Sequence, residues 1–387
     1  MSLKFPAFIV LLTLVVSCSP PAKNSAGLTV LDLSQDITVE SEMKLSQIAT
    51  DIHYTKLESN PECFIKRIEQ SSITNQYILI YDQTQLRVLL FDRQGKFIRK
   101  IGNIGKGPGE FNRPHDVRLS RDEKYILVMD FLKVIRFGLD GKLIGETKLP
   151  DFARNIDTFD DGLIGYFSSN STRMDNYSIA FFDWDGNCTG KLMKRDQDKT
   201  IRGKASRLAM FYCMNDEIRI NDRHSDTVFA VRPDRTLVPK IVLNDPHGKE
   251  ERSMENMNFQ LDVWMETPEY LFFHGAFNLM GHPMYLEKKT GLIYHIPFNK
   301  DLHRVGIPND LDGGAPFWPS RYQDGSVYQF QDANTLKSVL DNPLIDKSIF
   351  KNQTLRDQLI AFKKNLSEED GPVLIEIKLK YPPQPLP

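Results

Sequence analysis

The chain has 387 residues, and 49 Lys and Arg stand against 51 Asp and Glu, so its formal net charge is -2 at pH 7. This near balance gives no bulk attraction to nucleic acid, and we expect no nucleic-acid partner. A hydrophobic share of 41% and an aromatic share of 10% supply enough apolar surface for a packed core, which excludes wholesale disorder.

Residues 1–17 have the features of a signal peptide. Lys4 provides a weak positive start, and the mainly apolar run 5–16 is too short to span a bilayer, which takes about 20 residues. Val15-Val16-Ser17-Cys18 follows and resembles the lipobox of bacterial lipoproteins, in which the cysteine is acylated and becomes the new N-terminus. An ordinary secretory signal with an incidental cysteine is the alternative.

Residues 18–40 are predicted to be the lipidated Cys18 and a flexible tether, because residues 19–25 are polar and rich in proline. Several acyl chains would hold the protein stably on a membrane that it does not cross. We therefore expect a protein of the bacterial cell envelope, lipid-anchored to the outer membrane. Residues 19–25 lack the acidic cluster associated with surface export, which favours the periplasmic side.

A repeat runs through the middle of the chain, in which an apolar residue is followed four or five residues later by a turn glycine. Three copies carry Gly95, Gly141 and Gly186, spaced 46 and 45 residues apart. A degenerate copy has Arg235 at the glycine position, and a fifth carries Gly291. Glycine at this point indicates a tight turn with positive φ.

Short strand-like runs flank these turns and predict antiparallel hairpins. In the first two copies these runs are 77–82, 87–91, 97–101, 125–130, 134–137 and 143–144. A sheet of about four strands cannot bury its own faces, so consecutive copies must stack. Such a period is typical of a β-propeller, whose ring closure protects the sheet edges.

Residues 41–387 are predicted to form a single all-β domain, a six-bladed β-propeller of four-stranded antiparallel blades, at about 58 residues per blade. Seven blades are the alternative. Runs 324–330 and 373–379 are strand candidates for the last blade, and run 52–57 is available to complete a blade and latch the ring. A short helical insertion is expected at about 333–366.

Apolar residues at helical spacing within that insertion predict an amphipathic helix over 354–366. They are Leu355, Leu359, Phe362 and Leu366. We expect this helix to lay its apolar face on the ring, with partner docking as the alternative.

The lipobox, the repeat and the segment Gly107-Pro108-Gly109-Glu110-Phe111 together give the chain a recognisable pattern. It resembles the six-bladed propeller lipoproteins of Bacteroidetes-type bacteria, which are similar to NHL-repeat propellers. The resemblance is strongest over 45–149 and weaker after 243. It implies a fold and an envelope location, and because that family is largely uncharacterised it supplies no catalytic residues.

The glycine-rich stretch 102–111 also invites a phosphate-loop interpretation. No Lys-Ser/Thr pair follows at the required spacing, and Pro108 interrupts the stretch. An inter-blade turn explains the glycines through backbone geometry alone.

Five residues are candidates for ligand binding. Arg113, His115 and Asp116 stand where the innermost strand of the second blade should begin, and such a trio suits an anionic or polar ligand, or a metal ligand with a general base. The alternative is that they are solvated loop residues. Trp318 and Arg321 precede the predicted strand 326–330 and suit peptide or sugar recognition. For Trp318 the alternative is packing between blades.

The remaining histidines and cysteines give weaker signals. His224, His274 and His282 come from different parts of the chain and could converge on a metal, but nothing in the sequence brings them together. Cys188 and Cys213 could form a disulfide, and free thiols are at least as plausible. We predict no cofactor and no metal site.

No nucleophile, zinc-protease or calcium-loop motif occurs, and no catalytic residue is predicted. The sequence favours a monomeric binding or scaffold module for a protein, peptide or glycan ligand. The alternative is a metal-dependent hydrolase or lyase, lactonase-like or peptidyl-lyase-like, that holds Ca or Zn in the central channel.

Overall fold

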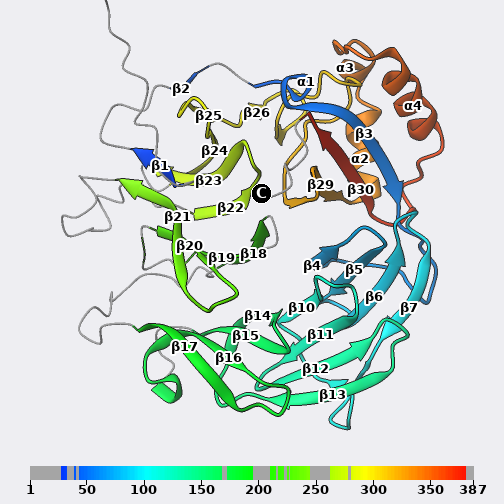
Figure 1. Cartoon of the computed structure of the whole chain (residues 1–387). Helices are drawn as coiled ribbons and strands as arrows, with labels where there is room; N and C mark the ends of the chain where they lie inside the picture. Colours follow the sequence, from blue (N-terminus) through cyan, green and yellow to red (C-terminus); the bar gives the residue numbers. More distant parts are fainter. Residues whose placement is uncertain are drawn as a thin grey trace, which may run out of the picture.

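The computed structural model describes residues 28–32, 39–40, 43–167, 172–194, 210–214, 217–221, 225, 227–244, 262–277 and 280–380. Six antiparallel sheets surround a central axis, and the first strand of each antiparallel blade lies nearest to it (Figure 1). Four sheets have four strands and two have a fifth strand added in parallel at the outer edge. The predicted six-bladed propeller is confirmed.

The blades follow one another along the chain. Blade 1 consists of β4 (Ile68–Ile73), β5 (Tyr77–Asp82), β6 (Arg87–Asp92) and β7 (Phe97–Ile101). Blade 2 consists of β10 (Asp116–Leu119), β11 (Tyr125–Asp130), β12 (Lys133–Gly138) and β13 (Leu143–Lys148). Blade 3 consists of β14 (Ala153–Phe159), β15 (Gly162–Phe167), β16 (Tyr177–Phe182) and β17 (Cys188–Lys194).

The second half of the ring repeats this order. Blade 4 consists of β18 (Met210–Met214), β19 (Glu217–Asn221), β20 (Thr227–Val231) and β21 (Leu237–Asn244), with β1 (Thr29–Asp32) added. Blade 5 consists of β22 (Asp262–Glu266), β23 (Tyr270–Phe277), β24 (Met280–Glu287) and β25 (Ile293–His295), with β2 (Val39–Glu40) added. Blade 6 consists of β28 (Arg321–Gln323), β29 (Ser326–Gln331), β30 (Val373–Leu379) and β3 (Ala49–Lys56).

The apolar runs seen in the sequence are strands that are packed on both faces. The predicted runs 77–82, 125–130 and 373–379 coincide with β5, β11 and β30. Each hydrophobic cluster joins neighbouring blades; one, for example, contains Leu79 of blade 1 and Val128 of blade 2. Because a blade is covered on both sides, its middle strands lack the alternation of polar and apolar residues that a half-exposed sheet would show.

The ring is closed by a strand from the N-terminal part of the chain. After the short helix α1 (Leu45–Ile48), β3 pairs antiparallel with β30 and places His53 opposite Glu376. The last blade therefore contains strands from both ends of the domain, and the prediction that run 52–57 latches the ring is confirmed.

The segment predicted as a tether takes part in the sheets. Within residues 18–40, β1 pairs in parallel with β21, and β2 pairs in parallel with β25. Strand pairing with the propeller therefore begins at Thr29, whereas the sequence predicted that the domain begins at residue 41. The predicted signal peptide and Cys18 lie outside the described residues.

The repeated turns dock each blade onto the one before it. Gly95 has a φ of +81°, and a Cβ atom there would lie 2.2 Å from the carbonyl oxygen of Lys56 in β3. Gly186 has a φ of +90°, and its Cβ would lie 2.5 Å from the carbonyl oxygen of Lys148 in β13. Glycine therefore serves two needs at once, the left-handed turn and the close approach of two backbones.

In the turn of blade 4, Arg235 replaces the glycine and its side chain contacts the preceding blade. It adopts a φ of +63° at the glycine position of blade 4. Its guanidinium group donates to the carbonyl oxygen of Thr189 in blade 3 at 3.2 Å and to the hydroxyl of the same residue at 3.1 Å. The missing glycine is thus compensated by polar contacts across the same blade junction.

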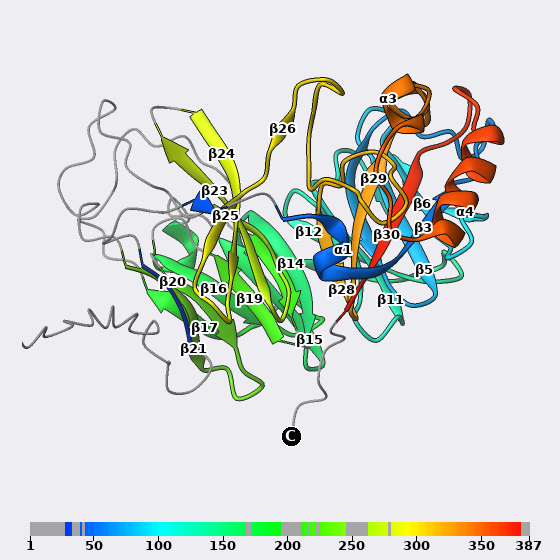
Figure 2. The same ribbon diagram turned by 90° about the horizontal axis from the view of Figure 1, so that it is seen from above.

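The antiparallel order places two kinds of connection on one face of the ring, namely those between blades and those between the second and third strands of a blade. We call this side the loop face. It carries the hairpin of β26 (Phe298–Asn299) and β27 (Arg304–Val305) and the insertion between β29 and β30, which project on the same side (Figure 2). The strands β8 (Asn103–Ile104) and β9 (Glu110–Phe111) and the 3-10 helix η1 (Thr172–Met174) lie in other connections on this face.

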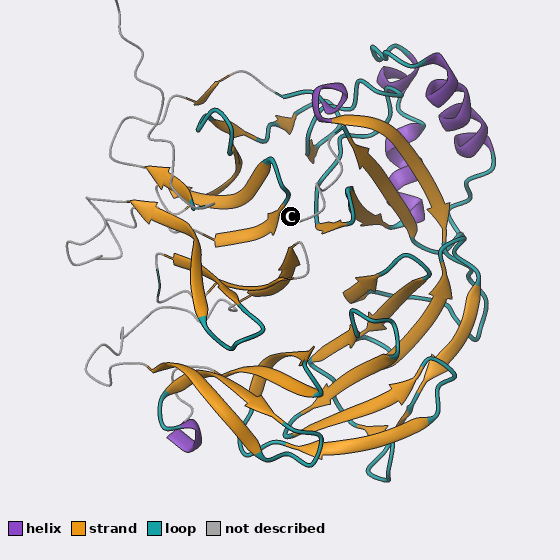
Figure 3. Ribbon diagram, in the orientation of Figure 1, coloured by secondary structure: helices purple, strands orange, loops and turns teal. Residues whose placement is uncertain are grey.

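The insertion contains α2 (Ala333–Leu340), α3 (Pro343–Asp346) and α4 (Gln353–Lys364), gathered beside blade 6 (Figure 3). The predicted amphipathic helix is α4. Leu355 and Leu359 are buried, and Phe362 stacks on Tyr54 of β3 with the ring centroids 5.0 Å apart. Of the helices in the described ranges, none has the length and apolar character needed to cross a membrane.

Candidate functional site

Two of the predicted ligand-binding residues begin innermost strands. Asp116 is the first residue of β10 in blade 2, and Arg321 is the first residue of β28 in blade 6. Arg118 and Asp116 of blade 2 and Cys213 of blade 4 all lie close enough to Arg321 to affect its pKa. Because blades 2, 4 and 6 are not neighbours, groups from all three can meet only near the axis of the ring.

These residues belong to what we call the axial cluster, which consists of Asp116, Arg118, Asp157, Cys213 and Arg321. The Asp116 carboxylate accepts a hydrogen bond from the Ile156 backbone N–H of blade 3 at 2.8 Å, and both of its oxygens lie 3.2 Å from Arg118 Nε. Arg118 Nη1 lies 3.7 Å from an Asp157 oxygen. One arginine thus joins the carboxylates of two adjacent blades.

The charges of this group are strongly coupled. Burial raises the pKa of Asp157, and the nearby Arg118 offsets this only in part. Burial alone would lower the pKa of the Arg118 guanidinium. The nearby carboxylates of Asp116 and Asp157 outweigh this effect, so the pKa is raised. Arg118 is therefore a fixed cation that is neutralised by its own neighbours.

Cys213 is not activated for nucleophilic chemistry. Its Sγ lies 3.7 Å from an Asp157 oxygen, and burial together with that carboxylate raises the thiol pKa to about 12. The thiol stays protonated at neutral pH and is a poor nucleophile. The disulfide between Cys188 and Cys213 does not form, since both thiols are free, and Cys188 is exposed on β17 in a different blade.

Arg321 differs from the other members of the cluster because none of the described residues forms an ion pair or hydrogen bond with its guanidinium group. Solvent reaches the side chain. Protein atoms nevertheless surround it, and this desolvation, with the like charge of Arg118, lowers the pKa of Arg321 to about 10. It remains a cation at neutral pH, and its charge is available to a ligand.

His115 and Arg113 lie beside the cluster and have different roles. His115 Nε2 lies 2.9 Å from the Ala153 carbonyl oxygen, and the imidazole stacks on Phe152 at 4.3 Å. Burial lowers the pKa of His115, so a neutral donor at Nε2 is favoured. Arg113 is exposed on the loop before β10, with its backbone N–H bonded to Asp130 at 3.0 Å. His115 is thus fixed between blades, and Arg113 faces solvent.

Trp318 lies in an aromatic stack between blades 5 and 6. Its ring is parallel to that of Trp264 in β22, with centroids 5.2 Å apart, and His274 lies 4.4 Å from Trp264. Trp264 Nε1 donates to the Pro319 carbonyl oxygen at 2.8 Å. This is the inter-blade packing considered as the alternative for Trp318, although part of the ring stays accessible to solvent.

The glycine-rich turn has no amide pocket left for a phosphate. The backbone N–H of Gly107 donates to Glu110 at 2.8 Å, and that of Gly109 donates to Glu146 at 2.8 Å. Carboxylates of the chain itself occupy these donors, which supports the predicted role as an inter-blade connection.

A histidine-based metal site finds no support among the residues that the structure describes, where no group of three His, Cys, Asp or Glu is arranged to hold a metal ion. His274 is engaged with Trp264. His224 lies outside the described residues, and nothing is described of the His282 side chain.

Sequence reasoning missed three members of the axial cluster. Arg118 follows Asp116 by two residues, so both point to the same side of β10, and this period could have revealed it. Asp157 occupies the corresponding innermost strand of blade 3. Cys213 was considered as a disulfide partner or a free thiol, and not as part of a site.

The fold and site define a six-bladed β-propeller whose axis carries paired charges and an arginine, Arg321, that has no ionic partner within the described part of the chain. The chain belongs to the family described as a domain of unknown function, DUF4934, whose model matches residues 28–378. This confirms the predicted resemblance to a family of propeller proteins. A search among curated proteins finds no match.

A solved structure shares the architecture, and a second is similar at a lower score. A Bacteroides fragilis protein, for which export from the cytoplasm has been inferred, is 18% identical with a TM-score of 0.67, over 91% of this chain and 100% of that one. A DUF4221 member from Bacteroides vulgatus is 11% identical with a TM-score of 0.46, over 86% of this chain and 97% of that one. At such identities the likeness concerns the fold alone.

Proposed function

We propose that this protein is a lipid-anchored binding propeller of the bacterial envelope, and that it holds an anionic group of a protein, peptide or glycan at Arg321. The observation that carries this proposal is the Arg321 guanidinium at the axis, which forms no ion pair with any described residue and lies beside an arginine that is already neutralised by Asp116 and Asp157. An arginine that lacks a protein partner is suited to a carboxylate, which it can bind through two parallel hydrogen bonds.

The chemistry of the cluster favours binding over catalysis. The Cys213 thiol stays protonated because burial raises its pKa, and the neighbouring carboxylates are occupied by Arg118 and backbone donors. A metal-dependent hydrolase or lyase remains the alternative from the sequence, and the described residues offer no observation that favours it.

The binding test compares carboxylated ligands with their neutral counterparts. An array of peptides and uronic-acid oligosaccharides, each printed also in amidated form, is probed with the mature protein and with Arg321→Gln. We expect selective binding of carboxylated members, weakened at least about tenfold by the substitution, as the loss of one charge-assisted contact implies. Equal binding of amidated members, or catalytic turnover of any member, contradicts the proposal.

The envelope location rests on the sequence around Cys18 and on the inferred export of the similar Bacteroides fragilis protein. We expect the wild type to take up labelled fatty acid and to fractionate with the outer membrane, whereas Cys18→Ser should be unlabelled and released in soluble form. Protease treatment of intact cells should spare the protein if it faces the periplasm. Labelling that persists in Cys18→Ser contradicts the anchor.

A further inference from the structure

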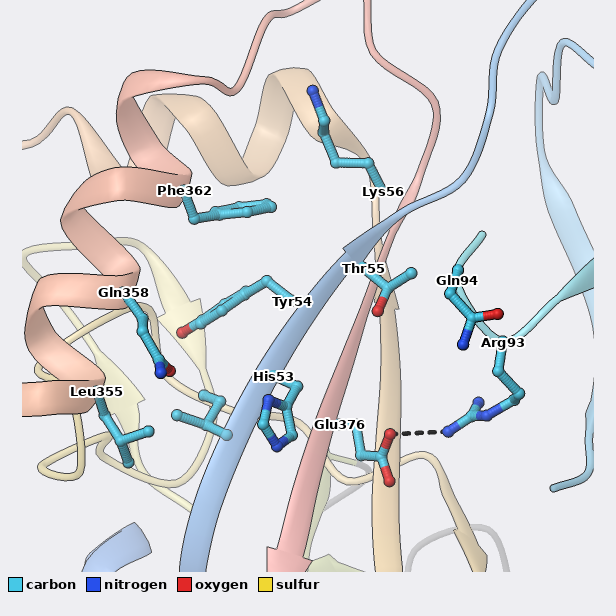
Figure 4. Close-up of a pocket in the computed structure, with 11 residues that line it drawn as sticks. His53, Tyr54, Thr55, Lys56, Arg93, Gln94, Leu355, Gln358, Phe362 and Glu376 are labelled. Atoms are coloured by element: carbon cyan, nitrogen blue, oxygen red, sulfur yellow. Dashed lines mark hydrogen bonds and ion pairs between the residues drawn. The ribbon is translucent and has the colours of Figure 1, made fainter. Parts of the chain in front are cut away.

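The outermost strand of blade 6 borders a groove. A hollow of about 740 Å³ follows β3 and is lined by five consecutive residues of that strand, from Ile52 to Lys56 (Figure 4). A second hollow of about 320 Å³ continues past Lys56 toward the loop face. Successive residues of a strand point to opposite faces, so a hollow that touches all five lies over the edge of the sheet.

The groove has two walls of different character. On one face of blade 6, α4 contributes Leu355, Gln358 and Phe362. On the other face, the turn between β6 and β7 contributes Arg93 and Gln94. Figure 4 shows α4 and this turn on opposite sides of β3.

The backbone of β3 is free in the middle of this edge. The backbone N–H of Leu57, just after β3, donates a hydrogen bond to the Pro372 carbonyl oxygen and so points toward β30. Backbone groups alternate in direction along an antiparallel strand, so Tyr54 and Lys56 direct theirs away from β30. At Lys56 the turn of blade 1 covers this edge, because Gly95 docks on the Lys56 carbonyl oxygen, whereas the backbone of Tyr54 opens into the groove. None of the described residues forms a hydrogen bond with the backbone N–H of Tyr54.

Only part of this edge is protected. The Asp51 side chain accepts the Ile52 N–H at 2.9 Å, which caps one outward donor. An open edge is a template for another strand unless it is blocked. The protein uses this property elsewhere, because β1 adds to the outer edge of blade 4 and β2 to that of blade 5.

We propose that an extended segment of a partner protein adds to β3 as a fifth strand of blade 6. Main-chain hydrogen bonds to Tyr54 and its neighbours supply affinity, and the two walls select alternate side chains. This site lies on the outer rim, so the proposal goes beyond the anion-binding function and does not depend on it.

The walls define the chemistry of that segment. Residues facing α4 meet Leu355 and the Tyr54–Phe362 stack and should be apolar. On the other wall the charges are already paired, since Arg93 Nη2 lies 2.7 Å from Glu376. The alternate residues should therefore be uncharged and polar, able to bond to Gln94.

The test uses a synthetic peptide of eight residues, the length of β3, in which valine alternates with glutamine. Its affinity for the mature protein is measured by fluorescence anisotropy, and exchange of single amides by mass spectrometry. We expect saturable binding of the peptide. Its affinity should fall at least about tenfold when alternate peptide nitrogens are methylated. The Tyr54 amide should exchange fast in the free protein and slowly in the complex.

A matched pair of variants on α4 localises the effect. Gln358→Trp fills the groove and should abolish peptide binding, whereas Ile360→Trp, exposed on the same helix but outside the groove, should not. Binding that survives N-methylation, or that leaves the Tyr54 amide unprotected, overturns the proposal. It is equally overturned if this amide is already protected in the free protein, by a second copy or by another part of the chain.

Discussion

At the scale of single residues, the repeated turn glycines are positions where one backbone approaches another. The carbonyl oxygen of Lys56 stands where a side chain at Gly95 would begin. Arg235 shows that the left-handed conformation alone does not require glycine, because its side chain reaches across the junction instead. Close contact between blades is therefore the stronger constraint at Gly95.

We predict that Gly95→Ala lowers the free energy of unfolding by about 2 kcal/mol or more, because it adds both backbone strain and a clash. Gly145→Ala is the matched control in the outer strand of blade 2, where the nearest atom to the new Cβ lies 3.8 Å away. It should change stability by less than about 0.5 kcal/mol. Equilibrium urea unfolding measures both, and similar losses would contradict the docking role.

At the scale of elements, neighbouring blades are joined by buried polar contacts as well as apolar packing. Glu266 of blade 5 is buried, and its carboxylate lies 2.6 Å from Lys288 Nζ and accepts the Tyr212 hydroxyl of blade 4 at 2.9 Å. Burial alone would raise the pKa of Glu266, but Lys288 and Arg219 outweigh it and hold the pKa below its ordinary value.

Glu266→Gln should destabilise the protein by about 3 kcal/mol near pH 7, because the half-buried Lys288 loses its carboxylate partner and the buried Arg219 keeps only Glu217. The folded-state pKa is depressed, so this contribution is present above the ordinary carboxyl range and is lost as the pH falls through the folded value. The difference from wild type in urea unfolding should therefore shrink in acid. The exposed Glu368→Gln is the control, expected to have little effect.

Much of the fold can be predicted from the sequence because the repeat is local. The Asp-Gly turns and the apolar runs between them specify blades directly, and run 52–57 is a strand without a sequential partner. The pairing of β1 could not be predicted, because four residues carry too little pattern to identify a partner more than 200 residues away. Asp116 and Arg321 were predicted one by one, but their convergence depends on ring closure.

At the scale of the whole molecule, stability depends on closing the circle. Each hydrophobic cluster is shared by neighbouring blades, and blade 6 with its neighbour blade 1 shares Leu374 and Phe91. Without β3, blade 6 would lose its outermost strand and the turn of blade 1 that contains Gly95 would lose the backbone on which it docks.

A chain that begins at Met43 should therefore keep the ring, because β1 and β2 are added outside complete blades. A chain that begins at Glu58 lacks β3 and should not unfold cooperatively. Differential scanning calorimetry distinguishes the two, with a single transition expected only for the longer chain. A cooperative transition in the shorter chain would show that β3 is dispensable for closure.

We propose that Arg321 provides an anion-binding site at the axis of the ring. Anomalous diffraction from crystals soaked in bromobenzoate, a bromine-labelled carboxylate, can locate such a site. We expect a bromine peak at the axis, with the carboxylate on the Arg321 guanidinium, and no such peak in Arg321→Gln under the same conditions. Bromine found only on the outer surface, or an axial peak that persists in the variant, would contradict it.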